Sequence, residues 1–280
     1  MAFVATITGM AKGISRGVAF PAPLRRAPAA APGGTEVVET FDTFRVVRHR
    51  VPIRGLRAPF SLLQISDVHL RHPTRAFERM CIDLSGLSAD AVVLTGDIVA
   101  REWQMTAVIH FFAHLPRGER FAILGNWEHW TGWDQNRLAP VLAPHKVKLL
   151  IDEGIDVGPI HLAGTDDALA AAPDFDRAVA GRTAGRPTVV LSHSPIAFPT
   201  IAALGVDLVL SGHTHGGQVR AGALGGPWLP KGSADYAHGW YAQGNTGLLV
   251  STGLGWSLLP LRFGVPPEVS RIELVPWEAS

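Results

Sequence analysis

The sequence predicts an α/β fold, on three observations. Short continuous runs of Val, Ile and Leu recur along the chain, and such runs indicate strands buried on both faces. Segments with the apolar spacing of a helix lie between these runs. Five of the runs end in polar residues that can bind metals. Strand, helix and strand in alternation imply an α/β sandwich with mainly right-handed crossovers.

The first 34 residues are predicted to be an N-terminal segment and a Pro/Ala-rich linker, followed by one folded domain over residues 35–280. The apolar N-terminus does not match a secretory signal, because Lys12 and Arg16 follow its apolar residues instead of preceding them. No apolar run reaches the roughly 18 to 20 residues that cross a bilayer. We interpret the segment as a frayed N-terminus or one in weak contact with a membrane.

The folded part begins with a β-like stretch from Val37 to Ile53. The five apolar runs that end in polar residues are Phe60–Ile65, Ala91–Leu94, Phe121–Leu124, Thr188–Leu191 and Asp207–Leu210. Each is predicted to be a strand of a sheet.

Helices are predicted between these strands. The i, i+3, i+4, i+7 spacing of Val108, Phe111, Phe112 and Leu115 indicates one, and residues 196–204 form a shorter apolar segment. After them the tail is β-rich, and Leu248–Thr252 and Val269–Val275 are expected to belong to a second sheet packed on the first.

The polar residues that follow the five runs form the candidate site, because ligands of open α/β sheets bind beyond the carboxyl ends of the strands. Two carboxylates, one amide and four imidazoles suit Mn, Fe, Zn or Mg-like ions, and the absence of thiolate argues against a purely structural zinc. Seven ligands suit two ions that share a bridging carboxylate. The set is Asp67, His69, Asp97, Asn126, His193, His213 and His215.

Composition excludes several classes of protein. With 25 Lys+Arg, 24 Asp+Glu and a formal charge of +1, the chain offers no general basic surface for nucleic acid, and the cluster at residues 45–50 is short. Hydrophobic residues make up 47%, which excludes wholesale disorder. The single cysteine, Cys81, excludes an internal disulfide framework.

The blocks around these residues resemble the signature of calcineurin-like metallophosphoesterases. They are Asp67-Val68-His69, Gly96-Asp97, Gly125-Asn126-Trp127-Glu128, Ser192-His193 and Gly212-His213-Thr214-His215, in the family's order. The resemblance implies a four-layer α-β-β-α sandwich of two mixed sheets for the metallophosphoesterase domain, residues 35–280. It also implies two divalent ions, Mn, Fe or Zn, and a metal-activated hydroxide that attacks phosphorus.

Ligand roles follow from the same resemblance. Asp67, His69 and His215 would hold one ion, and Asn126, His193 and His213 the other. Asp97 would bridge them.

A narrower resemblance covers residues 211–219 and 253–268, which look like one bacterial, often membrane-associated branch. That branch includes relatives linked to UDP-diacylglucosamine pyrophosphate hydrolysis in lipid A biosynthesis. The expected substrate is therefore a phosphodiester or pyrophosphate, lipid-linked or nucleotide-linked, in the cytoplasm or at the inner face of its membrane. The alternatives are a broad-specificity or cyclic-nucleotide phosphodiesterase and a non-catalytic metal-binding scaffold, and the oligomeric state stays open.

One residue departs from the family signature. Trp127 stands where the family has a His that contacts phosphate and assists the leaving group, and a Trp ring cannot donate that proton. His129 and His238 are the candidate replacements. Alternatively, a good leaving group such as that of an anhydride needs little acid. The catalytic candidates are thus Asp97, Asn126, His129 and His238, and the substrate-binding candidates are Trp127 and Arg262.

Other features admit a purely structural interpretation. Trp127, Trp130 and Trp133 form either a stacking rim or aromatic anchors of their loop. Arg262 meets either a substrate phosphate or an exposed ion-pair partner. The remaining expectations are a helix face for His110 and His114, a solvated turn at Asp166-Asp167, and a helix packed around Cys81.

Overall fold

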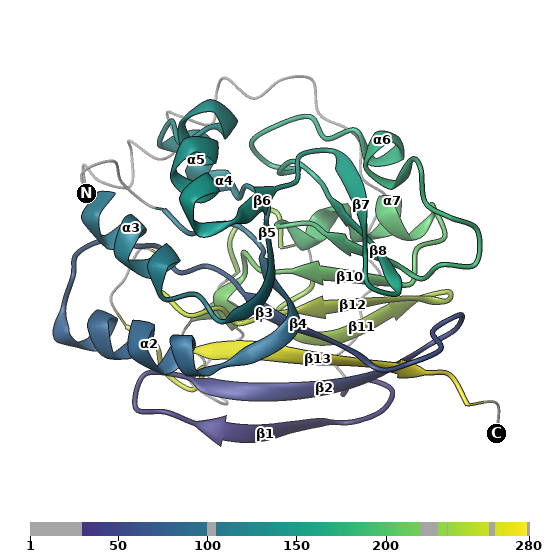
Figure 1. The fold of residues 1–280 in the computed structure, drawn as a ribbon, viewed down its shortest axis with the longest axis horizontal. Helices are drawn as coiled ribbons and strands as arrows, with labels where there is room; N and C mark the ends of the chain where they lie inside the picture. The colour runs from purple at the N-terminus through teal and green to yellow at the C-terminus, as the bar shows by residue number, and fades with distance from the viewer. Residues whose placement is uncertain (1–29, 100–104, 219–228, 234, 258–260, 279–280) are drawn as a thin grey trace.

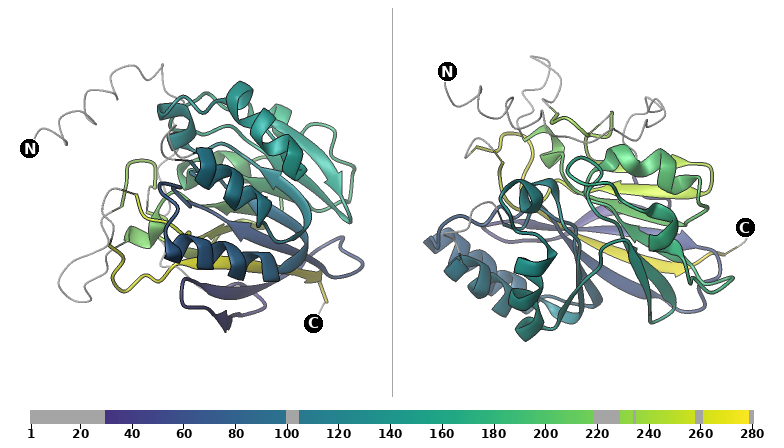
Figure 2. Two further views of the ribbon diagram at one scale, coloured as in Figure 1. Left: turned by 60° about the vertical axis from the view of Figure 1, so that its left-hand side comes forward. Right: turned by 90° about the horizontal axis from the view of Figure 1, so that it is seen from above.

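The computed structural model describes residues 30–99, 105–218, 229–233, 235–257 and 261–278. Most of the expected N-terminal segment therefore lies outside the described residues. Two mixed sheets stack face to face, and helices cover both outer faces (Figure 1). The predicted α/β fold and the four-layer α-β-β-α sandwich are both confirmed, and Figure 2 shows the layers from two further directions.

The first sheet has seven strands in the order β1-β2-β13-β3-β4-β5-β6. Its centre is parallel, since β4 pairs in parallel with both β3 and β5. The strands are β1 (Thr35–Thr40), β2 (Arg45–Ile53), β3 (Phe60–Ile65), β4 (Ser88–Leu94), β5 (Arg117–Ala122), β6 (Val147–Leu149) and β13 (Glu268–Pro276).

The second sheet has six strands in the order β11-β12-β10-β9-β8-β7. Here β10 pairs in parallel with β9 and β12, and β9 with β8, so the carboxyl ends of β9 and β10 share one edge. The strands are β7 (Glu153–Val157), β8 (Ile160–Gly164), β9 (Thr188–Leu191), β10 (Leu208–Ser211), β11 (Gly239–Gln243) and β12 (Thr246–Val250).

Helices cover the outer face of each sheet. On the seven-stranded sheet lie α2 (Arg75–Gly86), α3 (Met105–Ala113) and α5 (Gln135–Leu142). On the six-stranded sheet lie α6 (Phe175–Val179) and α7 (Phe198–Ala202). The short remaining helices are α4 (Asn126–Trp130), η3 (Ala143–His145), η4 (Pro195–Ala197) and η5 (His215–Gly217).

Alternation along each strand builds the core. Leu62 faces the apolar layer between the sheets, whereas its neighbour Leu63 packs beneath the helices on the other face. On β9, Val189 likewise faces the layer between the sheets, and Val190 packs beneath the helices of the other face. Because the central strands are covered on both faces, they have continuous apolar sequences, the pattern on which the prediction rests.

One assignment of the tail was wrong. β12 does belong to the second sheet, but β13 lies inside the first, parallel to β2 and antiparallel to β3. The side chains of β13 contribute to both apolar layers, since Val269 packs beneath the helices and Ile272 packs between the sheets. A strand from the end of the chain thus completes the sheet that the first strands begin.

Other expectations hold with small differences. The stretch from Val37 to Ile53 is a hairpin of two strands rather than one. The segment at 196–204 divides into η4 and α7, each with a proline in its first turn. Cys81 is buried in α2 as expected. Among the described residues, no helix is long and apolar enough to cross a membrane.

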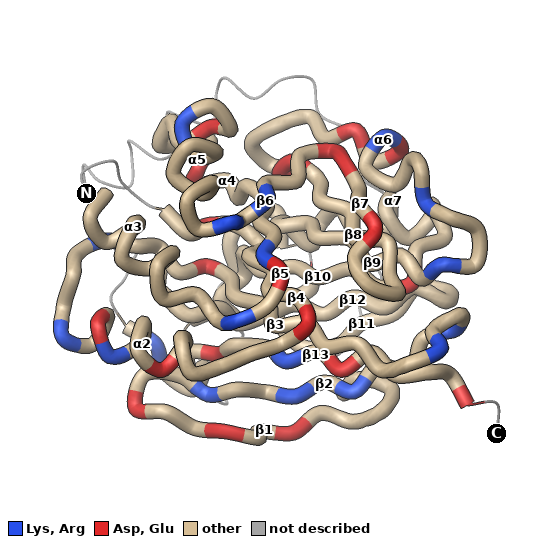
Figure 3. Tube along the Cα trace, in the orientation of Figure 1, with Lys and Arg blue, Asp and Glu red and all other residues tan. Residues whose placement is uncertain are grey.

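Acidic and basic residues are interspersed along the chain trace (Figure 3). The basic cluster on β2 faces acidic neighbours: Arg48 bonds Glu36 on β1, and Arg45 Nη2 lies 3.1 Å from a Glu268 carboxylate oxygen on β13. These neighbours offset its charge.

Candidate metal centre

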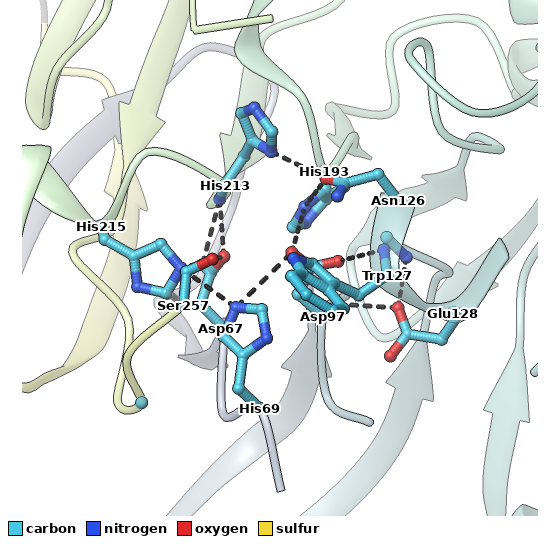
Figure 4. A network of polar contacts seen from close by, with 12 residues as sticks. Asp67, His69, Asp97, Asn126, Trp127, Glu128, His193, His213, His215 and Ser257 are labelled. Atoms are coloured by element: carbon cyan, nitrogen blue, oxygen red, sulfur yellow. Dashed lines mark hydrogen bonds and ion pairs between the residues drawn. The ribbon is translucent and has the colours of Figure 1, made fainter. Parts of the chain in front are cut away.

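The seven predicted ligands meet at one place, where the carboxyl ends of strands from both sheets come together (Figure 4). The loops after β3, β4 and β5 bring residues from the first sheet, and those after β9 and β10 bring residues from the second. All seven side chains are buried: Asp67, His69, Asp97, Asn126, His193, His213 and His215.

One group of metal-capable side chains comprises Asp67, His69 and His215. Their ligand atoms all lie within 4.8 Å of one another. The Nε2 atoms of His69 and His215 are 3.0 Å apart, and His215 Nε2 is 3.6 Å from Asp67 Oδ1.

The second group comprises Asp97, His193 and His213, and Asn126 lies against it. The carbonyl oxygen of Asn126 is 3.1 Å from His193 Nε2 and 2.8 Å from His213 Nδ1. Asn126 therefore faces the same point as the two imidazoles.

Asp97 joins the two groups. Its Oδ2 lies 3.6 Å from His69 Nε2 in the first group and 3.2 Å from His193 Nε2 in the second. Its Oδ1 accepts a hydrogen bond from the backbone N–H of Trp127 at 2.9 Å. One carboxylate oxygen is thus held by the backbone, while the other stands between the two groups.

The donor set fits a cation. His193 Nδ1 lies 2.7 Å from the carbonyl oxygen of Thr95 and must donate to it, so the neutral ring has a bare Nε2 that faces oxygen atoms of Asp97 and Asn126. His213 behaves in the same way, because Nε2 donates to the Lys231 carbonyl and leaves Nδ1 facing Asn126 Oδ1. These lone pairs converge, and a positive ion at their focus would satisfy them.

Without metal, a proton on His193 relieves part of the repulsion between the convergent lone pairs. Burial acts to lower the pKa of His193, but the carboxylates of Asp97 and Asp67 more than offset it and raise that pKa well above its ordinary value. Burial likewise acts to raise the pKa of Asp97, yet His193 holds it low. Without metal, the pair is an imidazolium against a carboxylate.

The other imidazoles stay neutral. Burial lowers the pKa of His69 to about 4 and that of His215 well below its usual value, and burial together with His193 lowers that of His213. Burial raises the pKa of Asp67 to about 6. Neutral imidazole is the form that binds a metal, so these three rings are already in the required state.

Backbone strain is concentrated in the site. Five of the eight described non-glycine residues with positive φ are candidate ligands: Asp67, His69, Asp97, His213 and His215, with φ between 48° and 70°. This left-handed region is uncommon for residues with a Cβ, and it persists where the surroundings fix the chain. These residues lie in the loops that follow β3, β4 and β10.

Gly125 permits a close approach between two of these loops. A Cβ at this position would lie 2.5 Å from the backbone N of Asp97 and 3.0 Å from its carboxyl carbon. The absence of a side chain allows the strand end before Asn126 to pack directly against the Asp97 loop.

Glu128 is a buried residue of the site to which the sequence analysis assigned no role. It is fully buried, and its carboxylate accepts from the backbone N–H groups of Asp97 at 2.9 Å, Val99 at 2.8 Å and Gly125 at 2.7 Å. Burial and the charge of Asp97 raise its pKa to about 7, although these donors limit the rise. Glu128 thereby holds the loop of Asp97 to the start of α4. A Glu three residues after the helix N-cap is the available sequence signal.

The tryptophans divide between the two interpretations. Trp133 is buried completely and anchors its loop. Trp127 is half-buried, and its ring lies edge to face with the His69 ring at a centroid distance of 5.6 Å. Trp130, which is 47% exposed, packs against Trp127. Trp127 and Trp130 therefore border the site.

Arg262 lies beside the first group rather than in an exposed ion pair. Its guanidinium donates to the carbonyl oxygens of Thr252 and Gly255, and Nη2 is 3.2 Å from His215 Nδ1. Burial lowers its pKa to about 10, so it remains charged at neutral pH. A role in binding phosphate stays a prediction.

The two catalytic candidates outside the ligand set have different surroundings. His129 Nε2 lies 2.6 Å from Asp166 Oδ1. His238 is half-buried and directly precedes β11. Its neighbour Ala237 has a carbonyl oxygen that accepts a hydrogen bond from Thr214, between His213 and His215. Its catalytic role stays a prediction.

The expectation of a solvated turn at Asp166-Asp167 was wrong. Asp167 is fully buried and accepts from Ser194 Oγ at 2.6 Å, so the turn packs against the loop of His193. By contrast, the helix-face interpretation of His110 and His114 is confirmed, because both are half-buried on or just after α3 with their rings stacked.

Comparison with known proteins agrees with this geometry. The sequence model described as calcineurin-like phosphoesterase matches residues 60–217. An uncharacterized metallophosphoesterase of Helicobacter pylori is 35% identical over 201 residues, which cover 67% of this chain and 51% of the relative. The chain thus spans about half the length of that protein.

Two further relatives have more specific names. Phosphodiesterase YaeI of Escherichia coli is 29% identical over 243 residues, covering 83% of this chain and 88% of the relative. The UDP-2,3-diacylglucosamine pyrophosphatase LpxG of Chlamydia trachomatis is 26% identical over 284 residues, covering 78% of this chain and 83% of the relative.

Proposed function

Because the chain belongs to the calcineurin-like phosphoesterase family, we propose that it is a dinuclear metal-dependent hydrolase of phosphodiester or pyrophosphate bonds. The observation that carries this proposal is the place of Asp97 Oδ2 between His69 and His193, as expected of a carboxylate shared by two ions. In the proposed assignment Asp67, His69 and His215 would hold one ion, Asn126, His193 and His213 would hold the other, and Asp97 would bridge them.

The two ions, when bound, supply an activated water and positive charge for the phosphoryl oxygens. The chain positions them. Thr95 fixes the tautomer of His193, and the Trp127 N–H fixes one oxygen of Asp97. Arg262 brings a further positive charge beside His215, where it supports binding of a phosphate oxygen.

The donor chemistry restricts the metal. Imidazole with carboxylate and amide oxygens, and no thiolate, suits Mn, Fe or Zn better than Ca or Cu(I). We propose Mn, Fe or Zn as the resident ions.

We further propose a substrate that carries an apolar group beside its phosphate. Trp130 borders the site on the side of His69, and Leu261 and Phe263 flank Arg262 on the side of His215. These three side chains are 47%, 54% and 59% exposed, so each presents apolar surface beside the site. A lipid-linked nucleotide anhydride at the cytoplasmic face of a membrane combines such an apolar group with a good leaving group. The name of the Chlamydia relative supports this choice.

The alternative is a broad-specificity or cyclic-nucleotide phosphodiesterase. The Escherichia coli relative is named a phosphodiesterase and is matched over most of its length, which favours this reading. A third reading, a metal-binding scaffold without turnover, is an outcome of the test below.

The test measures bound metal and hydrolysis on one preparation. The purified chain is loaded with Mn, Fe or Zn and given UDP-diacylglucosamine, cyclic nucleotides and bis-p-nitrophenyl phosphate. Asp97→Asn should lower the metal content and reduce hydrolysis about 100-fold, since it weakens the shared ligand. Asp176→Asn, an exposed substitution in α6, is the matched control.

The outcomes separate the three readings. Preference for the diacylated substrate supports the lipid-linked proposal, and preference for cyclic nucleotides supports the alternative. Bound metal without turnover on any substrate would identify a scaffold, and a preparation that binds no metal would contradict the proposed centre.

A further inference from the structure

An imidazole–carboxylate pair lies beside the candidate metal centre without belonging to it. His129 Nε2 is 2.6 Å from Asp166 Oδ1, and the two side chains are 21% and 18% exposed. Neither residue is in the two groups of metal-capable side chains. The pair is therefore partly shielded yet reachable from outside.

The pair lies on the side of His193. His129 is three residues after Asn126 on α4, so the two side chains project from neighbouring parts of the same helical surface. Asp166 follows Thr165, whose backbone N–H donates to the carbonyl of Leu191 at the end of β9.

A second contact fixes this loop. The next residue, Asp167, accepts from the hydroxyl of Ser194, which directly follows His193. The same turn that holds His129 is thereby tied to the ligand loop.

The charges around His129 favour its protonated form. Burial alone would lower its pKa, but the hydrogen bond and charge of Asp166, with Asp167 and Glu128 adding to them, raise it. The N–H of Asp166 in turn donates to Asp152 Oδ1 at 2.9 Å, which orients the carboxylate loop.

The second ring nitrogen is available. Nε2 is engaged by Asp166, whereas Nδ1 has no hydrogen-bond partner among the residues that the structure describes. A protonated ring therefore presents an N–H that no described side chain or carbonyl uses.

We propose that His129, oriented by Asp166, donates the proton to the leaving oxygen and so replaces the acid that Trp127 cannot supply. This inference rests on the proposed function. The oxygen of a water forms a bond to phosphorus, the bond from phosphorus to the leaving oxygen breaks, and that oxygen keeps the electron pair and takes the Nδ1 proton. The ring retains its Nε2 proton against Asp166 and regains the other from solvent, while the proton lost by the attacking water goes to solvent.

The experiment compares two diesters that differ only in leaving group, methyl p-nitrophenyl phosphate and methyl phenyl phosphate, on the metal-loaded full chain. Phenolate is the poorer leaving group and needs the acid more. His129→Gln should lose about 100-fold in kcat/KM on the phenyl ester but less than 10-fold on the nitrophenyl ester. The alkaline limb of the pH–rate profile should be flatter in His129→Gln than in the wild type. His114→Gln, on a half-buried His just after α3, is the matched control.

Asp166→Asn supplies a readout that does not depend on turnover. It should lower the pKa of His129 in an NMR titration of the metal-free protein and move the alkaline limb of the rate profile to lower pH. A pKa of His129 that is the same in both proteins overturns the proposal.

The kinetic outcomes are distinct. Equal losses on both esters in His129→Gln mean that the residue only supports the fold of the site, and no loss on either means that it takes no part. Either result overturns the proposal for His129 and leaves the proposed function standing. A metal-loaded wild type inactive on both esters overturns the proposed function, and the proposal with it.

Discussion

Gly125→Ala is expected to damage the site through a steric effect alone. The backbone of Gly125 has φ of −106°, a conformation open to any residue, so the substitution adds no backbone strain. The new Cβ would lie 2.5 Å from the backbone N of Asp97, whereas ordinary contacts begin at 3.4 Å. One of the two loops must therefore move by about 1 Å.

Either movement displaces a proposed ligand. If the loop after β4 gives way, Asp97 moves, and if the start of α4 gives way, Asn126 moves. Forcing an extra methyl into a packed region costs about 1 to 3 kcal/mol. A displacement of about 1 Å in a catalytic group can reduce activity about 100-fold.

The assay combines urea denaturation, metal content and kcat/KM on bis-p-nitrophenyl phosphate. Gly86→Ala is the matched control, since a Cβ at the end of α2 meets nothing within 4 Å. It should leave activity unchanged and raise stability by up to about 1 kcal/mol. If Gly125→Ala retains wild-type metal content and kcat/KM, the close approach of the two loops does not position the ligands and the reasoning is refuted.

Three further predictions concern stability. Loading with Mn at 100 times its dissociation constant should stabilise the chain by about 2.7 kcal/mol for each ion bound, and a chelator should reverse the rise in Tm; an unchanged Tm would argue against a site formed only in the folded chain. Burial lowers the pKa of His49 to about 4, below the unfolded 6.5, so stability present above pH 6.5 is lost as the pH falls towards 4. The wild type should lose about 3 kcal/mol more than His49→Gln between pH 7 and pH 4, and equal losses in urea titrations would contradict this. Thr74→Ala removes the hydroxyl that accepts from the Phe77 N–H at the start of α2 and should cost about 1 kcal/mol, measured against Thr43→Ala, whose hydroxyl caps no helix.

The ligand set could be predicted because its signal is local. Each predicted ligand follows a short apolar run, and the carboxyl ends of such strands meet at one edge of a sheet. The chain order of the blocks then added a family resemblance, which the comparison confirms. Neither signal requires knowledge of which strands are neighbours.

The features that escaped prediction depend on distant partners. The place of Glu128 after a helix N-cap indicates a capping role, but the donation from Asp97 and Val99 is seen only in the fold. Asp167 resembles a surface residue until Ser194, from the loop after β9, is placed beside it. The position of β13 within the first sheet follows from pairing across more than 200 residues, and its own sequence suits either sheet.

The origin of the ligands in two separate sheets has a mechanical consequence. Asp67 and His69 come from the seven-stranded sheet and His215 from the six-stranded one, and Asp97 and His193 divide in the same way. Each ion would therefore link the two sheets of the sandwich at the carboxyl ends of their strands. Separating the two sheets would first require the release of both ions, so the metal would slow global opening of the chain as well as serving chemistry.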